Sequence, residues 1–192
     1  AADTTAAPEK SEAETEAEAK DDAASGDLIV VGYAQVGAES DWRTANTESF
    51  KSTFTEENGY KLIFDDAQQK QENQIKAIRS FIQQDVDYIV VAPVVETGWE
   101  AVLQEAQEAG IPVILSDRQM DVDESLYECW VGGNFIKEGE TAGNWLADYL
   151  KAQGRDGEDI NIVTLQGTIG ASAQVGRTEG FGNILKQHDN WK

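Results

Sequence analysis

From residue 28 onwards, short apolar stretches alternate with longer amphipathic ones, and this alternation limits the fold more than any other feature. The stretch Ile111–Ser116 is β-branched and almost wholly apolar, which is typical of a strand buried on both faces of a sheet. In Gln71–Gln84 the apolar residues recur instead at helical spacing. Repeated strand–helix units form parallel sheets covered on both faces, so we predict an α/β fold with helices on both faces of a parallel sheet.

The same patterns predict where each element lies. The expected strands are 28–33, 60–64, 87–92, 111–116, 126–132 and 160–165. The expected helices are 42–57, 71–84, 98–109, 136–151 and 173–186. Gly110 should follow the third of these helices in the left-handed conformation that commonly ends a helix.

The first 27 residues have a different composition. They contain nine acidic residues, two lysines, and neither aromatic nor large aliphatic residues. Such a segment cannot bury enough apolar surface to offset its chain entropy, so we predict that residues 1–27 form a disordered acidic tether. No signal peptide or transmembrane span is recognisable, and the first residue is Ala1 rather than Met, which is compatible with earlier removal of a targeting segment.

Charge and composition exclude several kinds of function. Fifteen basic against 36 acidic residues give a formal net charge of −21, which argues against nucleic acid and disfavours an anionic membrane surface as partner. The single cysteine, Cys129, cannot form an internal disulfide and is expected to be a buried structural thiol. With His188 as the only histidine, zinc ligation and Cys–His catalysis have little support, and we predict no metal and no cofactor.

Asp117 and Arg118 directly follow the predicted strand 111–116. Open α/β sheets bind ligands at the carboxyl ends of their strands. A carboxylate accepts hydrogen bonds and a guanidinium donates several, so the two together suit a polyhydroxylated ligand such as a sugar. The alternative is a surface turn with a solvated arginine.

Motifs typical of α/β enzymes are missing from the sequence. The first strand is not followed by a dinucleotide fingerprint, and neither a Walker A motif nor a nucleophile elbow is present. The glycine-containing loop Gly167–Gly170 is explained as well by a tight turn as by an anion site.

Five segments carry a family resemblance: Gln35–Arg43, Gln68–Phe81, Ala92–Glu100, Ser116–Arg118 and Leu165–Ser172. In this order they resemble the type I periplasmic substrate-binding proteins of sugar ABC transporters, and within that family the galactofuranose-binding branch. The resemblance covers essentially all of residues 28–192. It implies two α/β lobes that are joined by hinge strands and close on a sugar. We therefore expect an N-terminal lobe at 28–133 and a partial C-terminal lobe at 134–192.

The resemblance also implies which residues bind the sugar. Those that match or adjoin the family motifs are Glu39, Ser40, Asp41, Trp42, Arg43, Asp117, Arg118, Asn134 and Arg177, with Gln35 as a further candidate. Asp41 stands where the branch often has glycine, and it either contacts the ligand or caps the following helix. Trp42 is alternatively a core aromatic, and Arg177 a solvated helix arginine.

The function implied by the resemblance is extracytoplasmic sugar binding without covalent chemistry. A monomeric binding protein would hold galactofuranose or a related furanose and deliver it to the membrane permease of an ABC transporter. The acidic tether resembles those that follow the lipidated cysteine of Gram-positive lipoproteins. The alternatives are a sugar-sensing domain of a receptor or histidine kinase, and a small α/β enzyme.

A complete member of the family continues its second lobe and then returns to the first. This chain ends at Lys192. The resemblance therefore predicts a truncated second lobe that is too small to bury a core of its own. Low stability of that lobe and weak sugar binding are the expected consequences.

Overall fold

A computed structural model describes residues 28–192, and the predicted tether at 1–27 lies outside the described residues. Five parallel strands form one sheet in the order β2-β1-β3-β4-β5. Their bounds are β1 Ile29–Gln35, β2 Tyr60–Asp66, β3 Tyr88–Val91, β4 Val113–Ser116 and β5 Cys129–Val131. The predicted parallel α/β sheet is thereby confirmed.

Five α-helices accompany the sheet in the described chain. Their bounds are α1 Asp41–Thr53, α2 Gln71–Gln83, α3 Glu100–Glu108, α4 Phe135–Ala152 and α5 Ser172–Leu185, and two 3₁₀ turns lie at Glu56–Asn58 and Glu124–Leu126. Gly110 follows α3 with a φ of 73°, as the sequence predicted for the residue that ends this helix.

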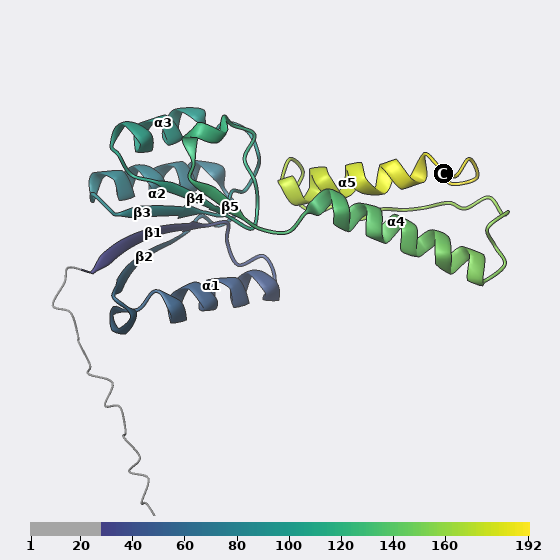
Figure 1. The fold of residues 1–192 in the computed structure, drawn as a ribbon, viewed down its shortest axis with the longest axis horizontal. Coiled ribbons are helices and arrows are strands. Elements are labelled where there is room, and N and C mark those ends of the chain that lie inside the picture. The colour runs from purple at the N-terminus through teal and green to yellow at the C-terminus, as the bar shows by residue number, and fades with distance from the viewer. Residues whose placement is uncertain (1–27) are drawn as a thin grey trace, which may run out of the picture.

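The sheet is covered on both faces, as shown in Figure 1. α2 and α3 cover one face and α1 covers the other. Successive residues of β3 point to opposite faces, so Ile89 and Val91 pack under α2 and α3 while Val90 belongs to the core on the α1 side. We call this part of the molecule, residues 28–131, the sheet body.

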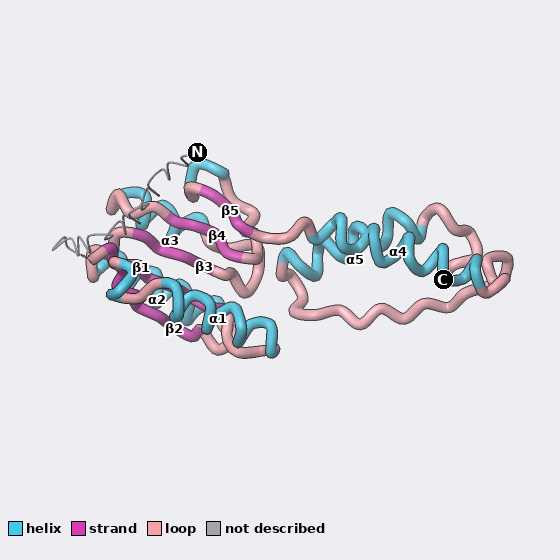
Figure 2. The backbone as a smooth tube through the Cα atoms, turned by 60° about the horizontal axis from the view of Figure 1, so that its bottom comes forward, coloured by secondary structure: helices cyan, strands magenta, loops and turns pink. Residues whose placement is uncertain are grey.

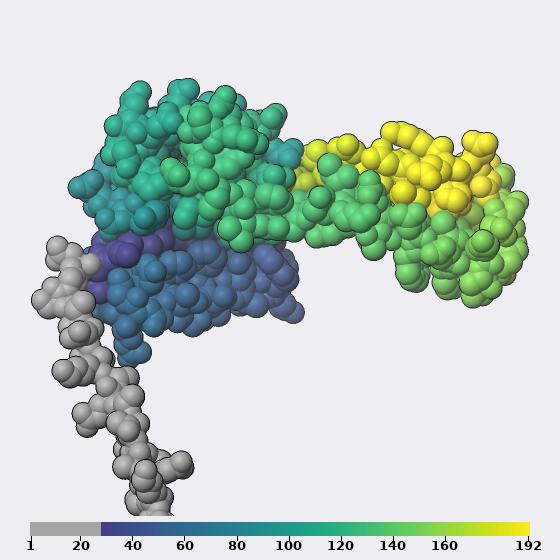
Figure 3. Space-filling view, in the orientation of Figure 1, coloured from purple at the N-terminus to yellow at the C-terminus, as the bar shows by residue number. Residues whose placement is uncertain are grey.

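The helices α4 and α5 lie outside the sheet body and pack against each other (Figure 2). Residues 134–192, which we call the helix pair, extend from the end of the body at which the strands finish (Figures 1 and 3). Glycines stand at the contact of the two helices. A Cβ atom at Gly139 would collide with the carbonyl oxygen of Arg177, and one at Gly180 with that of Ile136. The two helices can approach this closely because both positions lack a side chain.

The predicted strand 160–165 does not form. Its only ladder contact in the described chain is an isolated bridge between Ile160 and Trp191. Val163 and Leu165 are 87% and 94% exposed. The apolar pattern is that of a strand, but a strand also needs neighbouring strands to satisfy its backbone groups, and 28–192 supply only this one bridge.

The expected burial of Cys129 is also wrong. Cys129 is exposed because it lies on β5, which is the edge strand of the sheet. Val131, two residues along and on the same face as Cys129, is exposed as well, and Trp130 is the only partly buried residue of this strand.

Candidate functional site

The first loop of the site is held by the start of α1. Ser40 is the N-cap residue, and its hydroxyl accepts a hydrogen bond from the backbone N–H of Arg43 at 3.1 Å. Asp41, which the sequence allowed as a cap, is instead the first helical residue, where its negative charge is favourable to the helix dipole. Glu39 and Arg43 are one turn apart, and Nε of Arg43 donates to Oε1 of Glu39 at 3.1 Å.

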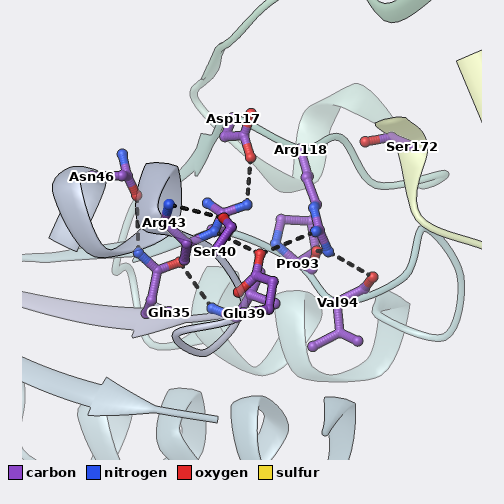
Figure 4. Close-up of polar contacts among 12 residues, drawn as sticks. Gln35, Glu39, Ser40, Arg43, Asn46, Pro93, Val94, Asp117, Arg118 and Ser172 are labelled. Carbon is purple, nitrogen blue, oxygen red and sulfur yellow. Dashed lines mark hydrogen bonds and ion pairs between the residues drawn. The ribbon is translucent and has the colours of Figure 1, made fainter. Parts of the chain in front are cut away.

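Asp117 and Arg118 reach the site from the end of β4. Asp117 adopts a φ of 64°, a left-handed conformation that is unusual for a residue other than glycine. Its Oδ2 accepts a 2.7 Å hydrogen bond from Nη2 of Arg43. This contact joins the first turn of α1 to the loop after β4, two segments that are 74 residues apart in the sequence, as Figure 4 shows.

Asp117 and Arg118 are neighbours in the sequence, but no ion pair links the two within residues 28–192. Arg118 points the other way, and its Nη1 donates to the backbone carbonyl of Val94 at 3.2 Å. Its Nη2 lies 3.4 Å from Oε1 of Glu39 (Figure 4). Asp117 and Arg118 thus contact different partners, Asp117 through Arg43 and Arg118 through Val94 and Glu39.

Two guanidinium groups and two carboxylates thus form one network in which Glu39 bridges Arg43 and Arg118. Burial, together with the nearby positive charge of Arg43, lowers the pKa of Arg118 below its usual value, while Glu39 and Asp117 act in the opposite direction. Arg118 remains charged at neutral pH, because the pKa of an arginine is far above neutrality.

One donor in this network is unsatisfied. Arg43 is only 2% exposed, and its Nη1 is buried without a hydrogen-bond partner among the described residues. A buried polar group without a partner costs free energy, and Nη1 of Arg43 is a donor that the contacts among residues 28–192 leave unpaired.

Trp42 stands beside this network and is 57% exposed. The alternative of a core aromatic is therefore wrong. The guanidinium carbon of Arg43 lies 4.9 Å from the centre of the indole ring, which helps to hold the ring in place. An exposed, oriented indole offers an apolar surface next to charged hydrogen-bonding groups.

The helix pair contributes a second wall. Nε of Arg177 donates to Oε2 of Glu138 at 2.8 Å, and its guanidinium carbon lies 5.0 Å from the ring centre of Phe135. Arg177 is thus an exposed arginine that is oriented by two neighbours. Asn134 caps α4 through a hydrogen bond from the backbone N–H of Lys137.

These groups surround one cavity of about 400 Å³ between the sheet body and the helix pair. Its walls are Glu39, Ser40, Trp42, Arg43, Asp117, Arg118, Gly133, Phe135, Glu138, Ala173 and Arg177. Of the residues that the sequence singled out, Asp41 and Asn134 are not among them. Gln35 is fully buried and bonded to Asn46 and Thr47, so it supports the fold of α1.

The sequence did not point to Phe135, Glu138 or Ala173. They lie on helices, and their approach to the cavity depends on how α4 and α5 pack, for which a single sequence carries no signal. Across residues 28–192 there is no cluster of three or more His, Cys, Asp or Glu side chains that could hold a metal ion. None of the helices described is long and apolar enough to cross a membrane.

Comparison with known proteins identifies relatives over most of the chain. A family model described as a periplasmic binding protein domain matches residues 31–192. The galactofuranose-binding protein YtfQ of Escherichia coli K12 is 50% identical over 165 residues, which are 85% of this chain and 50% of the relative.

Solved structures agree with this match. A Mycobacterium smegmatis protein in complex with β-D-fucofuranose has a TM-score of 0.80 at 52% identity, over 86% of this chain and 53% of that one. The binding protein of the arabinose ABC transporter from Shewanella sp. ANA-3, bound to L-arabinofuranose, has a TM-score of 0.76 at 49% identity, over 85% and 52%. The chain thus spans about half the length of the relatives it matches.

Proposed function

Because the chain belongs to the periplasmic binding protein family, we propose that it forms the ligand-binding part of a substrate-binding protein of a sugar ABC transporter. The ligand is a monosaccharide held between the sheet body and the helix pair. Relatives named for galactofuranose, fucofuranose and arabinofuranose support a furanose, with galactofuranose as the first candidate.

The observation that carries this proposal is the unsatisfied Nη1 of Arg43 beside the exposed ring of Trp42. A sugar presents hydroxyl oxygens on its edges and C–H groups on its faces. The hydroxyl oxygens accept hydrogen bonds from the guanidinium groups of Arg43 and Arg118, and the indole covers an apolar face. Glu39 and Asp117 accept hydrogen bonds from the hydroxyl protons.

In this proposal the two halves of the cavity close on the sugar. The residues 28–133 form the N-terminal lobe and supply the network of Arg43, Asp117 and Arg118. The residues 134–192 belong to the C-terminal lobe and supply Arg177. Closure removes the ligand from water and presents a surface to the permease. Binding needs no covalent chemistry, so the protein is not an enzyme.

The location follows from the family, whose members act outside the cytoplasm. We further propose that residues 1–27 tether a monomeric binding protein to the cell surface, as in a lipoprotein. The strongly acidic composition of that segment would keep such a tether solvated.

The test is calorimetric titration of the protein, expressed from its complete gene, with furanose and pyranose sugars. We expect tight one-to-one binding of a furanose. Arg118→Ala should weaken it by about 30-fold or more, because it leaves charges of the network unpaired.

A matched pair of tryptophan variants makes the test specific for this cavity. Trp42 and Trp145 are both exposed indoles, at 57% and 64%, but only Trp42 lines the cavity. Trp42→Ala should lower the affinity by about 30-fold, as expected for an aromatic residue that dominates a contact. Trp145→Ala should leave it unchanged. Equal effects of the two variants, or no heat with any sugar, would refute the proposal.

A further inference from the structure

The first residue of α5 is a buried serine with a partner in the sheet body. Ser172 is only 4% exposed, and its Oγ accepts a hydrogen bond from the backbone N–H of Gln119 at 2.9 Å. Gln119 directly follows Arg118, whose side chain runs from the same loop toward Pro93 and Val94 in Figure 4. A hydroxyl of the helix pair is therefore bonded to the loop that carries Asp117 and Arg118.

A second hydrogen bond joins the same two regions. The backbone N–H of Glu96 donates to the carbonyl of Gly170 at 2.9 Å, and the N–H of Asp121 donates to the carbonyl of Glu96 at 2.8 Å. Gly170 has a φ of 82°, so the turn before α5 relies on a residue that adopts the left-handed conformation easily. The start of α5 is thus attached to the loops that follow both β3 and β4.

This attachment bears on Arg177, which lies five residues further along the same helix. An α-helix is rigid over such a distance, so fixing its first turn also fixes the position of Arg177. Ala173 and Arg177 both line the cavity. Burial, the charge of Arg43 and, least, the charge of Arg177 lower the pKa of Arg118. The like charges of Arg177 and Arg118 thus oppose the approach of α5 that the attachment maintains.

We propose that Ser172 is a positioning residue for sugar binding: its hydrogen bond with Gln119 holds α5 against the Asp117–Arg118 loop, so that Arg177 and Arg118 reach the same ligand. The inference rests on the proposed function, since it concerns the geometry of the same cavity. It adds a residue that contacts no ligand and acts through Arg177.

The test compares Ser172→Ala, Arg177→Gln and the double variant by calorimetry with the furanose that the wild-type protein binds. Ser172→Ala should lower the affinity about 5-fold, the effect of one neutral hydrogen bond. In the Arg177→Gln background the same change should have no further effect, because the residue that Ser172 positions is already gone. Ser49→Ala, at an exposed serine of α1, is the control and should bind like the wild type.

The outcomes separate this inference from the function on which it rests. If the wild-type protein binds no sugar, the proposed function fails and the inference falls with it. If the wild type binds and Ser172→Ala binds equally well, only the inference is refuted. Additive losses in the double variant would also overturn it, as would loss of α5 helicity in Ser172→Ala, because the hydroxyl would then support the helix rather than position Arg177.

Discussion

The sheet body and the helix pair differ in how their buried residues support them. In the body, sixteen buried residues form a cluster under α2 and α3, and six more form a cluster on the α1 side. In the helix pair the corresponding cluster has four buried residues, Leu150, Ile160, Ile184 and Trp191. The close approach of α4 and α5 also depends on glycines at their contact.

The two walls of the cavity therefore differ in how firmly they are held. The network of Glu39, Arg43, Asp117 and Arg118 is anchored in the better-packed region, so its geometry is set before a ligand arrives. Arg177 comes from the less supported region and is held by Glu138 on the neighbouring helix. Because the network in the sheet body is preorganised, less free energy is lost in ordering it when a ligand binds. Arg177, in contrast, offers a contact whose position can change.

The largest expected effect tests whether the two regions differ in stability. Ile89 is fully buried between the sheet and its helices, and Ile89→Ala should lower the free energy of unfolding by about 4 kcal/mol. Ile184→Ala makes the same change in the smaller cluster and should cost about 2 kcal/mol, because that site can relax more easily. Urea unfolding followed by circular dichroism measures both. Equal losses would show that the two regions share one cooperative core.

A smaller effect tests the glycine contact in the helix pair. The Cβ atom of Gly180→Ala would meet the carbonyl of Ile136, so the helices must separate at a cost of about 1–3 kcal/mol. Gly182→Ala is the matched control on the same helix, where the new Cβ meets no atom within 4 Å. This second variant should stabilise the protein by up to about 1 kcal/mol through helix propensity. Thermal unfolding measures the change in stability of both variants. Equal destabilisation of the two would contradict a close contact between α4 and α5 at Gly180.

The smallest effect concerns pH. Partial burial and the neighbouring Asp66 raise the pKa of Asp65 above its usual value, so the ionised form is disfavoured in the folded state. This cost is present at neutral pH and disappears as the pH falls below the pKa of the unfolded chain. Asp65→Asn should therefore stabilise the protein by about 0.3 kcal/mol at pH 7, a small effect because solvent screens the charge. Near pH 3 the substitution should not change the stability.

The control for this prediction is Asp148→Asn, which removes an exposed carboxylate from α4. It accounts for the general benefit of lowering a net charge of −21. Denaturant midpoints of both variants at the two pH values are compared. If Asp65→Asn gains no more stability at pH 7 than Asp148→Asn, the effect does not come from the partial burial of Asp65 beside Asp66.

The sequence predicted the sheet body well for a specific reason. Strands buried on both faces need unbroken apolar runs, and amphipathic helices need apolar residues at regular spacing, so both leave local patterns. The segment 160–165 shows the limit of this argument. Its pattern is that of a strand, but Val163 and Leu165 remain exposed, since pairing depends on other segments and not on the pattern alone.

The candidate cavity was predictable to a similar degree. The position of Asp117 and Arg118 after a strand indicated a ligand site, and the resemblance drew attention to the loop that contains Trp42. Neither argument identified the partners of the two charged residues. Asp117 bonds to Arg43 and Arg118 to Glu39 because the segments that follow β1 and β4 meet beyond the carboxyl ends of the strands, although β3 lies between these two strands.

The parallel α/β class, the order of most elements and the resemblance to a sugar-binding family could all be predicted from the amino-acid sequence. Local patterns and motifs are enough for these, because each depends on residues near one another in the chain. The tertiary structure alone decided that Arg43 retains an unsatisfied donor, that Ser172 bonds to Gln119, and that α4 and α5 meet through glycines. Each of these depends on a contact between distant segments, and such contacts form only when the whole sheet and its helices pack together.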